Sequence, residues 1–469
     1  MAQTLEDHPF YERSWKDRAK APILVFLLAA MVFSAFAADR VRQASPDNHF
    51  AYLADSYLHG TLEMRVDPPH GNDWASYQIL TLASGQELRG IWWNRGERKF
   101  LDLEGNLYVI DRHDLRGSTE DRVSFVSFPP MPAVLMLPGV ALFGLDFNDV
   151  LFTIFFASLN AALMFMLLRR VILGGRSTLY PGDAWWLTAM FAIGSAHLWC
   201  SVQGAVWFTA LVVGVTFTLL YIHASIDAKH PFLAGLFLAC AFATRTPLLF
   251  SVVFFAIFFF FPGGKLRGDW GKQFWKDGLL FVAVPLVVGV TLLVLNYQRF
   301  HHLSEFGHTY LSNGQIQRIK EYGLFNVHFL SLNLTALLAL VPKFQPDAPY
   351  VVISKHGLAI WFTTSALLYL AAQREIATPA DRLWRRAAQA TIFVIFIPHI
   401  FYQNTGWVQF GYRFSMDYIA YLTLLLALGR KQLTTLFKAA VVLGIGINAF
   451  GAVTFGRFWD FYAEWVLER

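Results

Sequence analysis

Residues 21–37, APILVFLLAAMVFSAFA, form an unbroken apolar run, and residues 45–60, SPDNHFAYLADSYLHG, follow a few positions later. The first stretch is close to the length that a helix needs to cross the hydrocarbon core of a bilayer. The second stretch carries two aspartates and two histidines directly after that run. These two stretches together predict a membrane helix that delivers acidic side chains to the membrane surface.

The composition of the whole chain agrees with a membrane protein. Of 469 residues, 55% are hydrophobic and only 15% are charged, and the mean hydropathy is +0.42. The charged residues come in bursts between long apolar runs, which is typical of an all-α polytopic membrane protein and not of a soluble domain. Cys200 and Cys240 lie inside apolar runs, where we expect them to pack as small core residues. We expect membrane lipids around the chain and no nucleic-acid partner.

Apolar runs of sufficient length recur along the sequence and predict about eleven transmembrane helices. They lie near residues 22–38, 149–170, 184–200, 204–224, 231–244, 247–262, 278–297, 356–373, 388–403, 412–429 and 436–455. Residues 128–144, FPPMPAVLMLPGVALFG, are also apolar, but their prolines argue against a regular span. We therefore interpret this stretch as an interfacial or re-entrant helix.

The distribution of lysine and arginine predicts which segments face inward. The loops KLRGDWGKQFWKD (265–277) and QREIATPADRLWRR (373–386) are strongly basic, and the positive-inside rule places such loops in the cytoplasm. We therefore predict a cytoplasmic N-terminus at 1–21, followed by an uncleaved first helix at 22–38 and an outer loop at 39–148. Transmembrane helices at 149–297 lead to a second outer loop at 298–355. Further transmembrane helices at 356–455 are followed by an outer tail at 456–469.

The two long outer loops contain shorter elements. Residues 45–60 predict an amphipathic helix on the outer membrane surface, capped by Ser45, with an apolar stripe that runs from Phe50 to Leu58. Residues 87–114 alternate apolar and polar side chains between turn signals and predict a small β-rich insert. Residues 327–342, VHFLSLNLTALLALVP, predict a second interfacial helix.

Several phrases of this sequence resemble the GT-C superfamily of membrane glycosyltransferases, in particular the protein O-mannosyltransferase and aminoarabinose transferase type. The phrases run in order from residue 22 to residue 430 and include DNHFAYLADSYLHG, VSFPPMPAVLMLPGVALFG, LAGLFLACAFATRTPLLF, NYQRFHHLSEFGHTYL, GLFNVHFLSLNLTALLALVP and QFGYRFSMDYIAYLTLLLALGR. Two features depart from that pattern. Asp47 is followed by Asn48 where many relatives carry a second acid, and the insert at 87–114 matches no common feature of the superfamily.

The resemblance implies a GT-C-like fold and an activity. It implies an inverting transferase of a bacterial inner membrane, with its active site on the outer, periplasmic face. The donor would be a polyprenyl-phosphate-linked sugar, and the acceptor would be a glycan, a lipid or a protein. The acid after the first span, here Asp47, would be the catalytic base. The resemblance leaves the cofactor open: none is certain, a divalent cation is possible, and no metal ligand is assigned.

Asp47 also has a role that follows from chemistry. A lipid-linked sugar phosphate lies at the lipid–water boundary, and an acceptor hydroxyl needs a base as it attacks the anomeric carbon. A partly buried carboxylate at that boundary can serve. The alternative is that Asp47 is an acid favoured by a helix start. Asp55 lies two turns further on and would bind sugar hydroxyls or only solvate its face, and His49 and His59 are expected at the surface.

A departing lipid phosphate needs cationic partners. The candidates are Arg413, Arg245, Lys343 and His356. Arginines at such membrane positions are costly unless they are functional or paired, so the alternative for Arg413 and Arg245 is an interfacial position or an ion pair, with Asp417 as a partner for Arg413. Candidates for binding the sugar or the acceptor are Asp55, Glu305, Tyr412 and Gln409.

Two other classes of function remain open at this point. A polysaccharide polymerase or ligase would also use lipid-linked sugars but would need no acid directly after the first span. A transporter or flippase would carry functional polar groups near the middle of the membrane and internal repeats. The sequence shows no repeat, and its conspicuous polar residues lie in the predicted outer segments.

Overall fold

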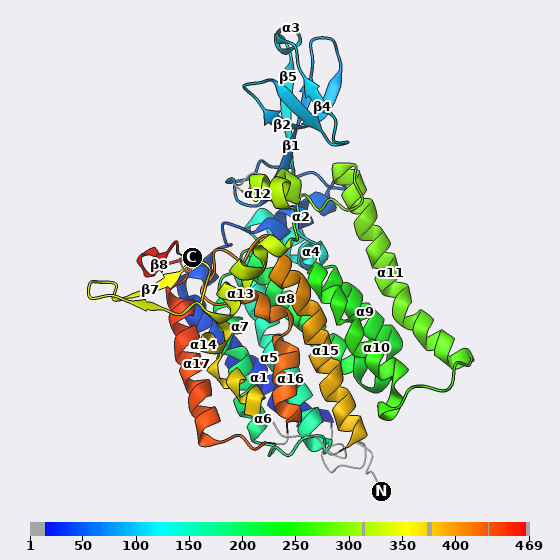
Figure 1. Ribbon diagram of the computed structural model, residues 1–469, viewed down its shortest axis with the longest axis vertical. Coiled ribbons are helices and arrows are strands. Elements are labelled where there is room, and N and C mark those ends of the chain that lie inside the picture. The colour runs from blue at the N-terminus through cyan, green and yellow to red at the C-terminus, as the bar shows by residue number, and fades with distance from the viewer. Residues whose placement is uncertain (1–14, 312–314, 373–377, 430, 466–469) are drawn as a thin grey trace. The chain divides into compact units, whose positions relative to one another are not determined.

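The computed structural model describes residues 15–311, 315–372, 378–429 and 431–465 (Figure 1). The chain divides into two compact units, which we describe separately. The bundle unit comprises residues 1–45, 148–285 and 325–469, and the sheet unit comprises residues 46–147 and 286–324.

The bundle unit is made almost entirely of helices. Its α-helices are α1 (Trp15–Ala37), α5 (Asp149–Leu173), α6 (Asp183–Ala192), α7 (Ala196–Ser201), α8 (Val206–Ser225), α9 (Pro231–Phe242), α10 (Val252–Phe260), α13 (Leu330–Leu338), α14 (Ile360–Thr363), α15 (Pro379–Phe401), α16 (Ile419–Leu428) and α17 (Thr435–Thr454). Helix α11 (Lys272–Phe300) begins in the bundle unit and ends in the sheet unit. Short 3₁₀ turns are η2 (Ala38–Arg42), η4 (Ile226–Ala228), η5 (Thr246–Ser251), η6 (Pro262–Gly264), η8 (Val327–Phe329), η9 (Ser365–Ala372), η10 (Arg413–Asp417) and η11 (Trp459–Phe461), and a small sheet joins β6 (Lys343–Phe344), β7 (Val351–Ser354) and β8 (Tyr462–Ala463).

Within the described residues, five helices are long and apolar enough to cross a membrane. They are Ala19–Arg42, Asp149–Leu173, Val206–Ala228, Lys272–Phe300 and Thr435–Thr454. They coincide with the predicted spans at 22–38, 149–170, 204–224, 278–297 and 436–455. The chain is therefore mostly helical with five candidate membrane helices, and the remaining predicted spans fall on shorter, broken or partly charged elements.

Two of these remaining spans are interrupted for local reasons. The predicted helix at 184–200 breaks at Gly194, because Ser195 caps a new helix by accepting the N–H of His197 at 3.2 Å. The predicted helix at 356–373 is irregular because its start pairs with another segment: the N–H of Leu358 donates to the carbonyl of Phe410 at 2.9 Å. A single regular helix at either place was a wrong prediction.

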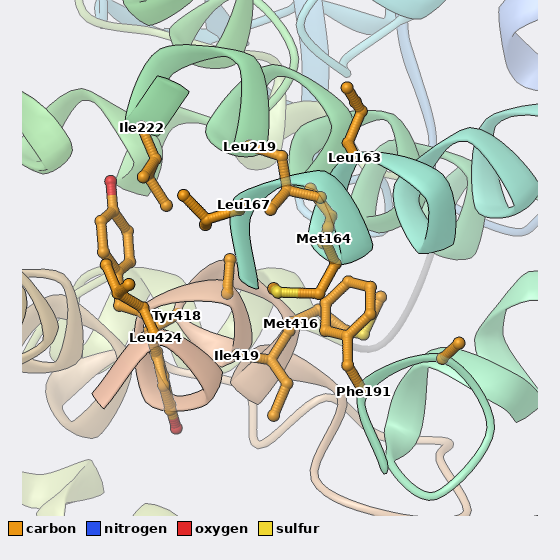
Figure 2. Packing of buried hydrophobic residues seen from close by; sticks show 14 of the residues in the cluster. Leu163, Met164, Leu167, Phe191, Leu219, Ile222, Met416, Tyr418, Ile419 and Leu424 are labelled. Carbon is orange, nitrogen blue, oxygen red and sulfur yellow. The ribbon is translucent and has the colours of Figure 1, made fainter. Parts of the chain in front are cut away.

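The core of the bundle unit lies between α5, α6, α8 and α16. Figure 2 shows side chains from these elements, such as Met164, Phe191 and Leu219, packed against one another. Buried hydrogen bonds connect Asn160 of α5 to α8. The hydroxyl of Thr216 donates to the Asn160 side chain at 2.6 Å, and the Asn160 amide donates to the carbonyl of Val212 at 2.9 Å. Such satisfied polar contacts hold apolar helices in register.

Two arginines tie the ends of α1 and α17 together. Arg40, just after α1, donates to the carbonyl of Phe455 at the end of α17 at 2.5 Å. Arg457, just after α17, donates to the carbonyl of Ala37 at the end of α1 at 2.5 Å and to Asp39 at 2.7 Å. Each arginine satisfies terminal carbonyls of the other helix. The C-terminal ends of α1 and α17 therefore lie together, and the two helices run parallel.

The sheet unit is built on a five-stranded antiparallel sheet. Its strands are β1 (Trp74–Thr81), β2 (Glu87–Asn94), β3 (Lys99–Asp102), β4 (Leu107–Val109) and β5 (Thr119–Val126), in the order β4-β3-β2-β1-β5. Its helices are α2 (His49–Leu58), α3 (Arg112–Leu115), α4 (Met131–Phe143) and α12 (Gln315–Tyr322), with 3₁₀ turns η3 (Gly144–Asp146) and η7 (His308–Tyr310). The predicted insert at 87–114 supplies β2, β3 and β4, so the small β-rich insert is confirmed. Strands β1 and β5 were not predicted.

The predicted helix at 45–60 forms, but shorter and in other surroundings. It begins at His49, and Ser45 does not cap it, because Ser45 donates its N–H and hydroxyl to the Asp149 carboxylate at 2.7 and 2.5 Å. The apolar stripe packs against α4, with Phe50 buried and Leu58 44% exposed. A stripe facing lipid was therefore a wrong prediction, because protein covers most of it.

The other predicted interfacial helices also form in part. Residues 128–144 contain α4, which exposes Leu142 and Phe143 at 79% and 65%. Residues 327–342 contain the short turn η8 and the short helix α13. Both α4 and α13 end in exposed apolar side chains, as an interfacial position requires, with Leu338 of α13 52% exposed.

Candidate active site

Asp47 lies two residues before α2, and its carboxylate is held by a neighbouring loop. The side-chain amide of Asn72 donates to Asp47 Oδ1 at 3.1 Å, and His70 Nε2 lies 3.4 Å from the same oxygen. His70 Nε2 also lies 3.0 Å from the carbonyl oxygen of Pro46. The Asp47 side chain is 19% exposed, so it is partly desolvated but still reaches the surface. A carboxylate in this position can accept a proton from a hydroxyl.

The side chain of His49 lies against the backbone of Asp47. Its ring is fully buried and stacks on Trp74 with centroids 3.6 Å apart and planes 5° apart. Nδ1 lies 3.0 Å from the carbonyl oxygen of Asp47, and Nε2 lies 3.0 Å from the carbonyl oxygen of Asn72. Burial lowers the pKa of His49 to about 4, although both carbonyls favour the charged ring. The prediction of a surface histidine was wrong, because the loop at 70–74 covers this ring.

The side chains of His49, His70, Asn72 and Trp74 together form what we name the Asp47 bracket. Three of them come from the stretch HGNDW at 70–74. This stretch lies more than 20 residues from Asp47, and its lack of a metal-binding spacing gave no reason to single it out. A loop dense in polar residues directly before a strand was the signal that the sequence offered.

Glu305 lies in a loop that packs beside the start of β1. Its carboxylate accepts the N–H of Gly307 at 2.7 Å and the hydroxyl of Thr309 at 2.6 Å, so it fixes the loop. Burial lowers the pKa of His308, and the carboxylates of Glu305 and Asp73 oppose this shift. The loop at 305–309 and the loop at 70–74 are therefore neighbours within the sheet unit.

Gly307 shows how closely these two loops pack. Its φ of +91° favours glycine, and a Cβ there would lie 3.0 Å from the side chains of both Ala75 and Ser127. The sheet unit thus brings Glu305 to the side of the sheet where β1 begins.

Asp55 points to a different set of partners. Arg65 Nη1 lies 3.4 Å from both of its carboxylate oxygens, and His59 Nδ1 lies 3.4 Å from Oδ1. His59 is exposed, as predicted. The structure therefore gives Asp55 a salt bridge at the end of α2, and the role of Asp55 in sugar binding stays a prediction.

In the bundle unit, Gln409 connects two of the predicted phosphate-binding residues. Its side-chain amide donates to the carbonyl oxygens of His356 and Thr405, both at 2.8 Å, and its Oε1 accepts the N–H of Arg413 at 2.9 Å. Gly406 makes room for it, because a Cβ at this φ of +100° would lie 2.5 Å from Gln409 Oε1. We name His356, Thr405, Gln409 and Arg413 the Gln409 frame.

The outer edge of this frame is polar and partly exposed. His356 Nδ1 lies 2.8 Å from the Thr405 hydroxyl, and its Nε2 lies 3.4 Å from a Glu464 carboxylate oxygen. The Arg413 side chain is buried and lies over the Phe208 ring at 5.4 Å. Since the three bonds of the Gln409 amide go to the backbone, Gln409 positions its neighbours, and its contact with a sugar stays a prediction.

Arg245 forms a buried ion pair with Asp417. Its Nε and Nη2 donate to the two carboxylate oxygens of Asp417 at 2.7 and 2.8 Å, and His399 Nε2 lies 2.9 Å from Asp417 Oδ2. The Asp417 side chain is only 1% exposed. Asp417 was expected as a partner of Arg413, and this was wrong because the bidentate geometry selects Arg245. Sequence reasoning also missed His399.

Arg245 and Arg413 nevertheless lie close to one side chain. Their guanidinium carbons are 5.8 and 5.7 Å from the centroid of the Phe414 ring. The structure therefore gathers both predicted arginines around Phe414, one neutralised by Asp417 and the other at the Gln409 frame.

Lys343 lies apart from these contacts, whereas Tyr412 lies beside Phe414. Lys343 is exposed, and its ammonium lies 4.0 Å from the centroid of the Trp465 ring. Tyr412 is buried beside Phe414, and its hydroxyl has no hydrogen-bond partner among the residues that the structure describes. Their predicted roles stay predictions.

The candidate residues thus fall into two groups by unit. Asp47, Asp55 and Glu305 belong to the sheet unit, and the rest of the predicted set belongs to the bundle unit. Across the described part of the chain, no three His, Cys, Asp or Glu side chains gather closely enough to hold a metal ion. Comparison with protein-family models, curated proteins and solved structures found no match to this chain.

Proposed function

We propose that this chain is an inverting glycosyltransferase of the GT-C type, with about eleven transmembrane segments. It would transfer a sugar from a polyprenyl-phosphate donor to a hydroxyl of a glycan, lipid or protein at the outer face of a bacterial inner membrane. The observation that carries the proposal is the Asp47 bracket: a partly exposed carboxylate oriented by Asn72, a few residues beyond the first candidate span.

The bracket supplies what a general base requires. A base must have a fixed position, a carboxyl group that reaches its substrate, and surroundings that do not hold the carboxylate permanently charged. Asn72 is a neutral donor, and His70 carries a charge only when it is protonated. The bracket therefore orients Asp47 through a neutral amide and an imidazole.

The proposed reaction is a single displacement. The acceptor hydroxyl gives its proton to the Asp47 carboxylate while its oxygen bonds to the anomeric carbon. The bond from that carbon to the phosphate oxygen breaks, and polyprenyl phosphate leaves with the electron pair. Attack opposite to the leaving group inverts the anomeric configuration.

The leaving phosphate needs positive partners, and the bundle unit has candidates for this role. Arg413 is held through its backbone by Gln409, and His356 is held by the same side chain. Arginine is well suited to bind phosphate oxygens because its donors are planar and permanently charged. Arg245 already pairs with Asp417, so we assign it to the support of this site and Arg413 to the phosphate.

The parallel arrangement of α1 and α17 agrees with an odd number of crossings. If both helices span the membrane in the same direction, the chain crosses an odd number of times from the first through the last. The arginine contacts at their C-terminal ends support this direction. A count of eleven, with residues 39–148 and the C-terminus outside, satisfies this requirement.

The test is a transfer assay with purified protein in lipid bilayers. A panel of synthetic polyprenyl-phosphate sugars is offered with added acceptors, with and without a chelator, to the wild type and to Asp47→Asn. We expect Asp47→Asn to lose at least about 100-fold in turnover, because base catalysis contributes roughly that much or more. Donor binding should persist.

Asp121→Asn is the matched control, because Asp121 is an exposed acid on β5 of the same unit. It should turn over like the wild type. Equal turnover by Asp47→Asn and the wild type would remove Asp47 from the chemistry. Donor turnover that survives this change would favour a polymerase or ligase that needs no acid after the first span.

A further inference from the structure

A short hairpin in the bundle unit exposes two aromatic side chains. Strands β6 and β7 pair antiparallel, and the N–H of Gln345 donates to the carbonyl of Tyr350 at 3.0 Å, which closes the turn. Phe344 and Tyr350 are 81% and 63% exposed. Large aromatic side chains this exposed on an ordered hairpin indicate a surface that something covers.

The position of this hairpin is fixed relative to a candidate span. Strand β7 pairs in parallel with β8, and β8 begins at Tyr462, shortly after α17 ends at Thr454. The same end of α17 carries the ion pair between Arg457 and Asp39. Charged pairs of this kind occur where a membrane helix leaves the hydrocarbon. The hairpin therefore lies at the level of the lipid–water boundary.

The direction of the hairpin keeps it at that level. Figure 1 shows it projecting sideways from the end of α17, across the direction of the helix axis. A hairpin that rose along the axis would enter water, and one that turned back would meet the hydrocarbon. A sideways projection from the end of a membrane helix runs along the headgroup layer.

The side chains around the hairpin match this layer. Five exposed aromatic residues lie on the hairpin, on the segment after α17 and at Trp407, and we name them the aromatic rim: Phe344, Tyr350, Trp407, Phe458 and Trp459. Trp407 is linked to β8 because its indole N–H donates to Glu464 at 3.0 Å. Tryptophan and tyrosine concentrate at membrane interfaces, where one part of the ring is dry and the other is wet.

The base of the hairpin carries cations. Lys343 lies over the Trp465 ring at 4.0 Å, and Lys355 lies 3.9 Å from Glu464. Lysine side chains at this level place their charge among phosphate groups while their stems cover apolar surface. The charges and the aromatic rings are therefore arranged as a lipid surface would require.

We propose that residues 343–352 form an interfacial anchor whose Phe344 and Tyr350 insert into the headgroup layer of the bilayer. The partner is the lipid surface itself. This inference does not depend on the proposed glycosyltransferase activity, because it rests only on exposure, position and direction within the bundle unit.

Spin labels test this position directly. The chain has only two cysteines, so Cys200→Ala with Cys240→Ala gives a background for single labels. A nitroxide at Phe344→Cys, and a second at Tyr350→Cys, are compared in lipid bilayers with two references. Leu443→Cys, 56% exposed on α17, is the lipid reference, and Ser84→Cys, exposed in the turn after β1, is the water reference.

We expect labels at 344 and 350 to be reached by oxygen more readily than the label at Ser84, and by a water-soluble nickel chelate at least about threefold less. Their accessibility should fall between the two references. Labels as open to nickel as that at Ser84 would overturn the proposal. So would labels shielded from both reagents, since this would show that protein, such as a second copy of the chain, covers the hairpin.

Discussion

Two carboxylates of this chain, Asp47 and Asp417, are held in opposite ways. Asp417 is 1% exposed and binds Arg245 through both oxygens, with His399 as a further partner. Asp47 is 19% exposed and is oriented by the neutral amide of Asn72. A carboxylate locked to a buried arginine is a poor proton acceptor, whereas an oriented and partly exposed one can act as a base.

This difference divides the candidate residues into those that build the fold and those that do chemistry. Arg245 was a candidate for phosphate binding, yet its ion pair links η5 to η10 within the bundle unit. Asp47 is oriented by the Asn72 amide and remains partly exposed. Mutations should therefore separate stability from turnover, and the following predictions use this separation.

The largest expected effect is on Asp417. Replacing Asp417 by Ala leaves the charged, mostly buried Arg245 without its carboxylate partner, which should lower the free energy of unfolding by about 3 kcal/mol. Denaturant unfolding in detergent measures this loss. The paired change Arg245→Met with Asp417→Leu should recover much of it, because it removes both charges. If Asp417→Ala unfolds like Asp47→Asn, the contrast between the two carboxylates is lost.

His49 gives the second largest effect, through pH. Its pKa is lowered from 6.5 to about 4 by burial, so the unfolded chain binds a proton that the folded chain does not. Stability contributed by neutral His49 is therefore present above pH 6.5 and is lost as the pH falls towards 4, to a total of roughly 3 kcal/mol.

Unfolding of His49→Gln and the wild type between these two pH values measures this contribution. The variant should show a shallower decline, and His59→Gln, an exposed control at the opposite end of the same helix, should follow the wild type. Equal slopes for His49→Gln and the wild type would show that the ring is not buried in neutral form.

The third prediction concerns Asn72, which orients the base. Asn72→Asp keeps the shape but places a second carboxylate beside Asp47 Oδ1, where the amide now lies at 3.1 Å. Like charges at this distance favour protonation of one group. We expect turnover to fall about 10- to 100-fold at neutral pH, or about 1.4–2.7 kcal/mol, and the acid limb of the pH–rate profile to move upward.

Asn72→Ser distinguishes the effect of an added charge from the loss of the orienting hydrogen bond, since it removes the amide donor without adding a carboxylate. It should lower turnover less and leave the acid limb in place. An unchanged profile for Asn72→Asp, with turnover reduced equally at every pH, would assign Asn72 a purely structural role.

The sequence predicted the elements whose signals are local. Long apolar runs predicted α1, α5, α8, α11 and α17, and alternation predicted β2 to β4. The contacts that decide function are not local, because Arg245 and Asp417 lie 172 positions apart and Asn72 lies 25 positions from Asp47. No periodicity links such pairs, so only the folded chain reveals which carboxylate is locked and which is oriented.

At Ser45, the local rule for helix capping gave a wrong prediction because the side chain binds a residue that is distant in the sequence. A serine before a helix predicts a cap, but the buried carboxylate of Asp149 accepts both the N–H and the hydroxyl of Ser45. Asp149 also accepts the N–H of Ala205 at 2.9 Å, so one acid ties three segments of the bundle unit together. The competing partner was more than 100 positions away and carried no signal near Ser45 in the sequence.

The smallest expected effect tests the neighbourhood of Asp417. The Tyr412 hydroxyl is buried and without a hydrogen-bond partner among the described residues, so Tyr412→Phe removes an unsatisfied group. We expect the free energy of unfolding to rise by about 1 kcal/mol or less, because leaving a buried donor unpaired costs a similar amount. Kinetics with the substrate then test whether Tyr412 also binds the sugar or the acceptor. If Tyr412 binds the sugar or the acceptor, Tyr412→Phe raises KM while stability improves, whereas unchanged KM and kcat would make Tyr412 a packing residue around Phe414.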